Sequence, residues 1–136
     1  MGLAHDVRIA VLRLARRLRT EGGNDRLTLT QVSALAMLER HGPLTPGQLA
    51  AHERVQPPSM TPVIAVLAAE GLLTREPHPH DRRQRLVTVS PAGAEWLAAN
   101  RRRREAWLAQ QLDGLPDADL AALRAALPVC DALAQG

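Results

Sequence analysis

The chain has 136 residues, of which 46% are hydrophobic, and its formal net charge at pH 7 is +3. This length suits one domain with a core of its own, and the apolar content argues against disorder. A single cysteine, Cys130, excludes an intramolecular disulfide framework and a multi-cysteine zinc site. The chain has no Phe or Tyr, so Leu, Val and Ala must fill the core, which favours helices.

Apolar periodicity predicts two helices in the first third of the chain. The first is expected over residues 3–19, with arginines opposite its apolar stripe and with Gly22 and Gly23 ending it. The second is expected from about Thr30 to His41, where Gly42 stops it. Its expected buried face consists of Val32, Leu35, Met37 and Leu38.

The next two helices have distinct start and stop signals. Thr45 is followed by Pro46 and, three residues after the cap, by Gln48, which together form a capping box with proline at the first helical position. The fourth helix is expected from Pro57 to a left-handed stop at Gly71.

A hairpin and two further helices complete the predicted order of elements. Residues 72–76 and 85–89 alternate well enough for two short strands, and prolines 77 and 79 confine the turn between them. Ser90 and Pro91 then cap a long helix that is expected to end at Asp113. A last helix is expected from about Asp117, with a kink at Pro128.

Helix, turn, helix and hairpin in this order resemble the MarR-type winged-helix transcription regulators, and the resemblance covers nearly the whole chain. It is carried by GPLTPGQLA (42–50), VQPPSMT (55–61), EGLLTREPHPHDRRQRLVTVSPAG (70–93) and the Arg-rich helix leading to Trp107 and Leu108. The resemblance implies a mainly α (α+β) fold: a winged helix-turn-helix with six helices and a two-stranded β-wing. It also implies a sequence-specific, ligand-responsive DNA-binding regulator, most often a repressor.

The expected organisation is a single MarR-like domain over residues 1–136. Residues 28–92 form the winged helix-turn-helix lobe, and residues 1–22 and 93–136 form dimerisation helices. The resemblance implies a homodimer that binds a pseudo-palindromic operator in double-stranded DNA. The residues give an independent reason, because the first and last helices carry apolar stripes that a small winged core could not cover alone.

The fourth helix is the expected recognition helix. Its first turns offer short side chains that can approach base edges, and its prolines offer apolar surface to a thymine methyl. Alternatively, Ser59 merely caps the helix and Met60 packs inward. The family often has a basic residue where this chain has Pro62, whose missing amide proton predicts a kinked first turn. The expected DNA-binding residues here are Gln56, Pro57, Pro58, Ser59 and Thr61.

The hairpin tip is the second expected DNA-binding element. Asp81 and Arg83 resemble the family pair in which the acid orients a neighbouring arginine and an arginine enters the minor groove, where negative potential is concentrated. Either Arg82 or Arg83 is the groove residue, and Arg85 is expected to meet phosphate. The alternative for a charged tip is a solvated turn.

Arginines 101–104 cover every face of one helical turn, so they cannot all serve one site. We expect most to be solvated, with Arg101 pairing to Glu105 and Arg103 lying over Trp107. Alternatively, one of them lines an anion-binding pocket near the dimer junction. Family members often bind small aromatic or anionic effectors there, but the sequence assigns no effector site.

Metal, redox and enzymatic roles find little support in the residues. His78 and His80 lack a third well-spaced ligand, so they are expected to be surface residues, and no metal or cofactor is expected. Cys130 is expected to be buried and inert rather than a redox sensor. No Ser-His-Asp arrangement, P-loop or dinucleotide fingerprint is present, so the chain is not expected to be an enzyme.

Two rival functions remain open: a non-specific DNA coater, and a small-molecule-binding protein that cannot bind DNA. The modest net charge weakens the first, and Pro62 keeps the second open. The sequence shows no signal peptide and no run of roughly 20 apolar residues, so a cytosolic, nucleoid-associated protein without a membrane partner is expected.

Overall fold

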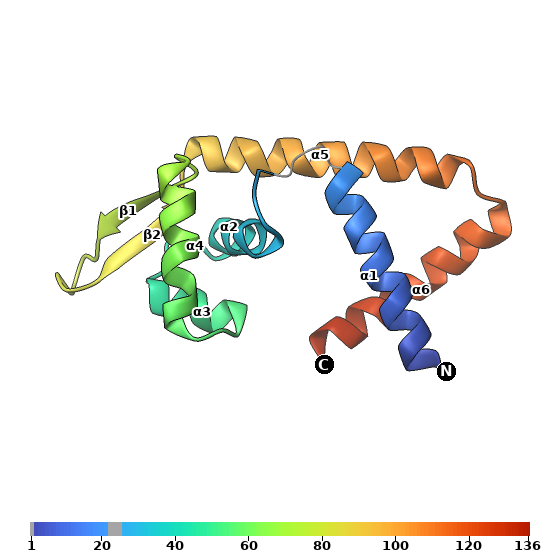
Figure 1. The fold of residues 1–136 in the computed structure, drawn as a ribbon, viewed down its shortest axis with the longest axis horizontal. Coiled ribbons are helices and arrows are strands. Elements are labelled where there is room, and N and C mark those ends of the chain that lie inside the picture. The colour runs from blue at the N-terminus through green and yellow to red at the C-terminus, as the bar shows by residue number, and fades with distance from the viewer. Residues whose placement is uncertain (1, 22–25) are drawn as a thin grey trace.

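The computed structural model describes residues 2–21 and 26–136. The elements follow the predicted order, as Figure 1 shows, and the stop expected at Gly22 and Gly23 lies outside the described residues. They are α1 (Leu3–Glu21), α2 (Leu29–His41), α3 (Pro46–Glu53), α4 (Pro57–Ala69), β1 (Leu73–Pro77), β2 (Arg85–Val89), α5 (Pro91–Asp113) and α6 (Asp117–Gln135).

Capping boxes start both α2 and α3. The backbone amide of Gln48 donates to the Thr45 hydroxyl over 3.2 Å, and the Gln48 side-chain oxygen accepts from the Thr45 amide over 2.9 Å, which confirms the predicted box. Thr28 and Gln31 form the same pair of bonds, with distances of 3.1 and 2.9 Å. The helix α2 therefore begins at Leu29, one residue before the position expected from apolar periodicity.

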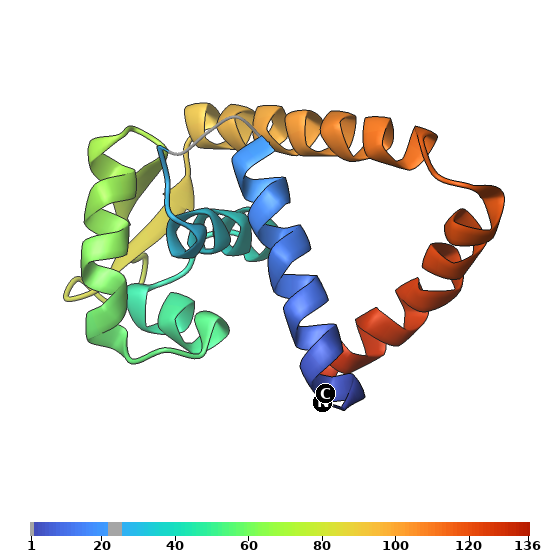
Figure 2. The ribbon, with the colours of Figure 1, turned by 45° about the vertical axis from the view of Figure 1, so that its right-hand side comes forward.

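The buried apolar side chains all lie between residues 27 and 97, so the core is that of the winged lobe. Leu35 and Leu38 are buried as predicted, whereas Val32 and Met37 are half-buried against the same core. Within the described residues, neither α1 nor α6 has a buried side chain. In Figure 2 these two helices extend from α5 and, with it, outline an open triangle beside the lobe.

The wing is an antiparallel pair in which Leu73 lies opposite Val89 and Pro77 opposite Arg85. A further bridge, which the sequence did not indicate, joins Leu44 in the α2–α3 loop to Val87 in β2. The Leu44 amide donates to the Val87 carbonyl over 3.0 Å, and the Val87 amide donates to the Leu44 carbonyl over 2.7 Å. The wing is thereby fastened to the helix-turn-helix.

The start of α5 is locked against the start of the wing. The Ser90 hydroxyl caps α5 by accepting from the Gly93 amide over 3.0 Å, and it donates to the Gly71 carbonyl over 2.6 Å. Gly71 has a φ of 74°, which confirms the predicted left-handed stop. Gly93 is needed for a different reason: a Cβ at this position would lie 2.0 Å from the Leu72 carbonyl oxygen.

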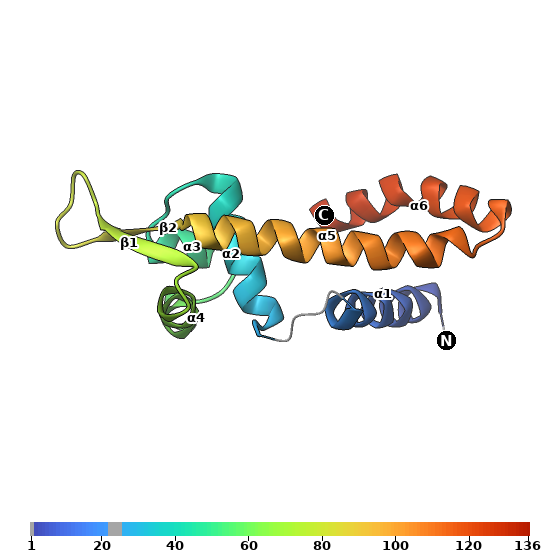
Figure 3. The same cartoon turned by 90° about the horizontal axis from the view of Figure 1, so that it is seen from above.

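Neither interior proline ends its helix, since α4 continues through Pro62 and α6 through Pro128. Figure 3 shows α5 as the long helix that joins the lobe at one end to α1 and α6 at the other. No helix among the described residues is long and apolar enough to cross a membrane.

Candidate nucleic-acid interface

The first two turns of α4 divide into a buried and an exposed face. Met60 is only 1% exposed and packs into the core, as the sequence allowed. The N-cap is Gln56, so the alternative that Ser59 merely caps the helix is wrong. Within the part of the chain that the structure describes, the Ser59 hydroxyl has no hydrogen-bond partner. The exposed residues here include all five that the sequence proposed, namely Gln56, Pro57, Pro58, Ser59 and Thr61.

The turn before α4 depends on an unexpected left-handed residue. Arg54, with φ 58° and ψ 43°, ends α3, and its amide donates to the Ala51 carbonyl over 3.1 Å. The Val55 amide donates to the Ala50 carbonyl over 3.0 Å. Gly and Asn are the residues that usually adopt a left-handed backbone conformation at the end of a helix. An arginine at position 54 therefore gave no signal of this conformation. These bonds set the direction in which α4 leaves α3.

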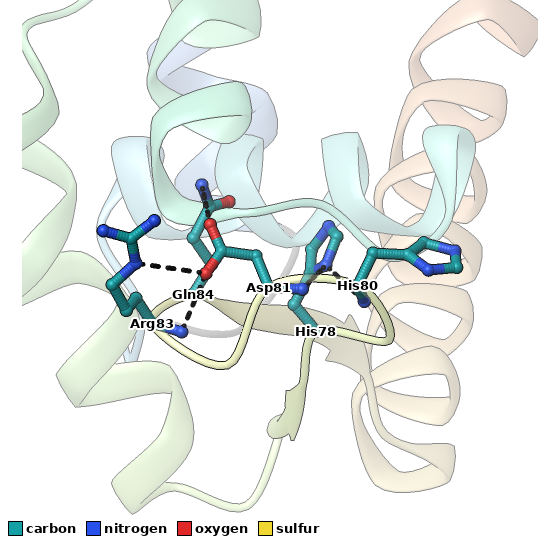
Figure 4. A network of polar contacts seen from close by, with 5 residues as sticks. All are labelled: His78, His80, Asp81, Arg83 and Gln84. Carbon is teal, nitrogen blue, oxygen red and sulfur yellow. Dashed lines mark hydrogen bonds and ion pairs between the residues drawn. The ribbon is translucent and has the colours of Figure 1, made fainter.

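The wing tip is organised around the Asp81 carboxylate, as Figure 4 shows. Its Oδ1 accepts from the Arg83 amide over 3.0 Å and lies 3.5 Å from the Arg83 Nε, while Oδ2 accepts from the Gln84 side chain over 3.4 Å. The expected contact between Asp81 and Arg83 is therefore present. The Arg83 side chain is 93% exposed, so the pair adds little stability and serves instead to orient the guanidinium.

A second anchor at the tip is His78, which was expected to be a surface residue. Its Nδ1 accepts from the His80 amide and from the Asp81 amide, both over 3.1 Å. Its own amide donates to the Gln84 carbonyl over 3.2 Å. The side chain is half-buried, and the described residues contain no group of three or more potential metal ligands around it or elsewhere.

The other two arginines that the sequence proposed as DNA-binding residues of the wing differ from Arg83. Arg82 is exposed and forms no ion pair or hydrogen bond with any described residue. Arg85 begins β2 and, with Arg83 and Gln84, lines an open pocket against residues 45–47 at the start of α3. In Figures 1 and 2, the start of α4 and the wing tip both lie at the edge of the lobe opposite α5.

Arginines of α5 contact other helices as well as α5 itself, where Arg102 Nη2 lies 3.9 Å from Glu95 Oε1. The expected pairing of Arg101 with Glu105 is wrong, because Arg101 Nη1 lies 2.7 Å from Glu39 Oε1 of α2. The expected stacking of Arg103 on Trp107 stays a prediction, and Arg17 of α1 lies over that ring at 5.2 Å from its centroid. Long side chains reach the helices packed against α5, which spacing within one helix could not show.

One face of α5 contains polar atoms that lack partners. Trp96 Nε1, Asn100 Nδ2 and Arg104 Nε are buried donors with no acceptor in the described part of the chain, and they follow one another at intervals of four residues. Burial, followed by the charges of Arg19 and Arg103, lowers the pKa of Arg104 from its usual value. Arg104 also lines an open pocket between α1 and α5 with Leu18 and Leu108. Composition and spacing gave no sign of these atoms.

The expectation that Cys130 is buried is wrong for the single chain, because its thiol is exposed. The apolar flanks of Cys130 suggested burial, but no described residue packs closely enough on this face of α6 to bury it.

The MarR family model matches residues 27–84, which contain α2, α3, α4, β1 and the wing tip. An HTH-type transcriptional regulator of Mycobacterium leprae is 54% identical over 110 residues, covering 81% of this chain and 77% of the relative. The chain belongs to the MarR family. An HTH-type regulator of Mycobacterium tuberculosis is 49% identical to this MarR protein over 131 residues, covering 96% of this chain and 92% of the relative.

Solved structures agree with the MarR assignment. The crystal structure of a Pseudomonas aeruginosa protein described as a transcriptional regulator matches with a TM-score of 0.87 and 35% identity, covering 98% of this chain and 94% of that one. Wild-type MarR of E. coli matches with a TM-score of 0.77 and 22% identity, covering 96% and 97%, and supports the fold alone. The chain is thus an HTH-type transcriptional regulator with six helices and a two-stranded wing, from a family of regulators rather than enzymes.

Proposed function

We propose that this MarR regulator works as a homodimer that represses transcription by binding a pseudo-palindromic operator. The observation that carries the proposal is that the exposed start of α4 and the arginine-bearing tip both lie on the side of the lobe away from α5. A helix start of this kind fits the major groove, and an arginine tip fits the adjoining minor groove. Residues 28–92 are the DNA-binding lobe in this proposal.

The start of α4 reads base edges in the major groove. Gln56, Ser59 and Thr61 supply polar groups, while Pro57 and Pro58 supply apolar surface for a thymine methyl. The burial of Met60 supports this assignment, because it fixes the rotation of the helix and leaves the polar residues on the open side. Pro62 follows on the same exposed surface and replaces the basic residue frequent in relatives, so phosphate attraction near this turn is weaker.

The wing contacts the neighbouring minor groove and backbone. Asp81 Oδ1 accepts from the Arg83 amide and lies 3.5 Å from its Nε, which limits the directions that the guanidinium can take. Arg83 is therefore the groove residue, and the untethered Arg82 and the strand residue Arg85 meet phosphates.

Dimerisation uses residues 1–22 and 93–136. Large apolar side chains are exposed along α1 and α6, and leaving so many in water is unfavourable for a single chain. A second copy has the same faces and can cover them about a two-fold axis, which also places two lobes on one duplex. The exposed large apolar residues of the two helices are Leu3, Val7, Val11, Leu12, Leu14, Leu123, Leu127, Val129 and Leu133.

A small aromatic or anionic effector binds between the lobe and the arms, which are the helices α1 and α6. The support is the face of α5 on which Asn100, only 2% exposed, and Arg104 present donors without acceptors. A carboxylate there would accept hydrogen bonds from those donors. Its negative charge would also offset the positive charges of Arg19, Arg103 and Arg104. By changing the angle between lobe and arms, the effector would alter the separation of the two α4 helices and weaken operator binding.

Selection of binding sites from a random duplex pool tests the proposal, followed by anisotropy titrations of the winning and a scrambled duplex at several salt concentrations. We expect an inverted repeat with half-sites about one helical turn apart, bound at least roughly a thousandfold more tightly than the scramble. Equal binding that falls steeply with salt would indicate a non-specific DNA coater instead. No binding to either duplex would favour a DNA-incompetent small-molecule-binding protein.

A further inference from the structure

The wing tip contains a histidine whose ring is used as a hydrogen-bond acceptor. His78 Nδ1 accepts from the amides of His80 and Asp81, two and three residues further on, both over 3.1 Å. An imidazole nitrogen can accept only when it carries no proton, so the ring proton of His78 is on Nε2. The tip conformation therefore depends on a neutral His78.

The bonds of His78 continue to the arginine at the tip. Nδ1 holds the Asp81 amide, and the Asp81 carboxylate in turn accepts from the Arg83 amide over 3.0 Å and approaches its Nε at 3.5 Å. Figure 4 shows this path from the imidazole through Asp81 to the guanidinium. Losing the first bond frees the residue that orients Arg83.

We propose that His78 is a positioning residue for DNA binding: its unprotonated Nδ1 holds the tip in the shape that presents Arg83, and acid releases it. The inference rests on the proposed function, in which the wing contacts DNA. It makes operator recognition by this protein sensitive to pH in the range where histidine changes charge.

The charged groups around His78 come from the wing itself. Asp81 is the nearest acid, His80 presents its ring to that of His78 with centroids 6.1 Å apart, and Arg83 lies beyond Asp81. At the start of α3, the residues that line a pocket with the wing are Thr45, Pro46 and Gly47, none of which is charged. The other charged residues of the wing are Arg75, Glu76, Arg82 and Arg85.

Acid has two opposing effects on DNA binding, and the experiment must separate them. Protonated histidines attract phosphates of any sequence, which strengthens binding to every duplex. Protonation of Nδ1 removes both bonds at the tip, which weakens only the binding that needs a positioned Arg83. The ratio of operator affinity to scrambled-duplex affinity isolates the second effect.

His78→Asn is the decisive variant, because the Asn side-chain oxygen stands at the same number of bonds from the backbone as Nδ1. Asn accepts from following amides in turns and does not titrate. We expect the affinity ratio of the natural protein to fall about tenfold from about pH 8 to about pH 5.5, and that of His78→Asn to stay within about twofold. His78→Ala should have the low ratio at both pH values. His80→Asn, which removes the neighbouring ring, should behave like the natural protein.

Nitrogen-15 NMR of the free dimer provides a readout that needs no DNA. On acidification, the His78 Nδ1 resonance and the amide resonance of Asp81 should shift together, and in His78→Asn the Asp81 amide should not shift. An Asp81 amide that does not shift in the natural protein, or a pH loss of the affinity ratio that persists in His78→Asn, would overturn the inference. If no duplex is bound specifically at any pH, the proposed function fails, and the NMR titration still decides whether His78 holds the tip.

Discussion

The lobe and the helical arms of this protein differ in how far they bury their apolar side chains. Residues 27–97 bury a contiguous set of Leu, Ala, Met, Ile and Val side chains, whereas α1 and α6 bury none of their described side chains. The same chain thus has one region that buries its apolar side chains by its own contacts and another that leaves them exposed, and in the proposed homodimer the second copy covers them. The comparison supports the proposal that the lobe binds DNA and that α1 and α6 form the dimer interface.

The largest effect is expected on dimerisation, when a charged residue is placed on the exposed apolar face of α6. In Leu127→Asp, each dimer loses the burial of two leucines that are 60% exposed in the single chain. At about 1.5–3 kcal/mol for each leucine, the dissociation constant should rise at least about 100-fold. Sedimentation equilibrium measures this constant, and Val66→Ala, at an exposed apolar position of the lobe, should leave it unchanged. If Leu127→Asp dimerises normally, α6 is not part of the interface.

The next largest effect is expected on the free energy of unfolding, at the close contact between the lobe and the start of α5. Gly93→Ala would place a methyl group 2.0 Å from the Leu72 carbonyl oxygen, so backbone must move, and the free energy of unfolding should fall by about 3 kcal/mol. Gly47→Ala is the matched control, because a Cβ at this position would lie 4.0 Å from Thr45 Oγ1. Because Gly47 lies in the helix α3, Gly47→Ala should raise the free energy of unfolding by about 0.5 kcal/mol. Urea unfolding at fixed protein concentration compares the two, and equal stabilities would contradict the tight packing at Gly93.

The direct contacts with bases and grooves should come from the lobe. Arg83→Ala should weaken operator binding by about 1–3 kcal/mol, because it removes the arginine that Asp81 orients, and Arg82→Ala should cost less. Arg124→Ala removes the same charge from α6 and should change affinity little. Anisotropy titration of the folded variants decides the order, and a larger loss in Arg82→Ala would assign the groove to that residue instead.

The smallest effect lies at the boundary between the two regions. Arg104→Leu removes a guanidinium whose Nε has no acceptor among the described residues and whose pKa is lowered by burial and by Arg19 and Arg103. The free energy of unfolding should rise by about 1 kcal/mol, whereas the exposed Arg102→Leu should shift it by less than about 0.5 kcal/mol. Thermal unfolding tests this, and a loss of stability in Arg104→Leu would mean that the dimer supplies the missing acceptor.

Features set by neighbours in sequence could be predicted from the sequence. The capping box of Thr45 and Gln48, the stop at Gly71 and the order of elements depend on bonds that close within a few residues. The similar box of Thr28 and Gln31 was missed because Leu29 is 61% exposed, so the apolar stripe does not extend to the helix start.

Features set by distant contacts could not be predicted. Arg101 pairs with Glu39, and Arg17 covers Trp107, because α2 and α1 pack on α5, and no spacing rule within α5 contains that information. The exposure of Cys130 depends on what covers α6, which a single sequence does not specify. At the candidate site, the pair of Asp81 and Arg83 was predictable from resemblance, but the role of His78 required the ring position to be known.

The bridge between Leu44 and Val87 has a consequence for how operators can change during evolution. Two backbone bonds of 2.7 and 3.0 Å join the wing to the loop before α3, and they involve no side-chain atoms. Substitutions at the surface of α4 or at the tip can therefore retune base preference without loosening the relative placement of the two elements. In the proposed function, the backbone fixes the distance between the minor-groove and major-groove contacts, so new operators are expected to differ in bases while keeping the same spacing within each half-site.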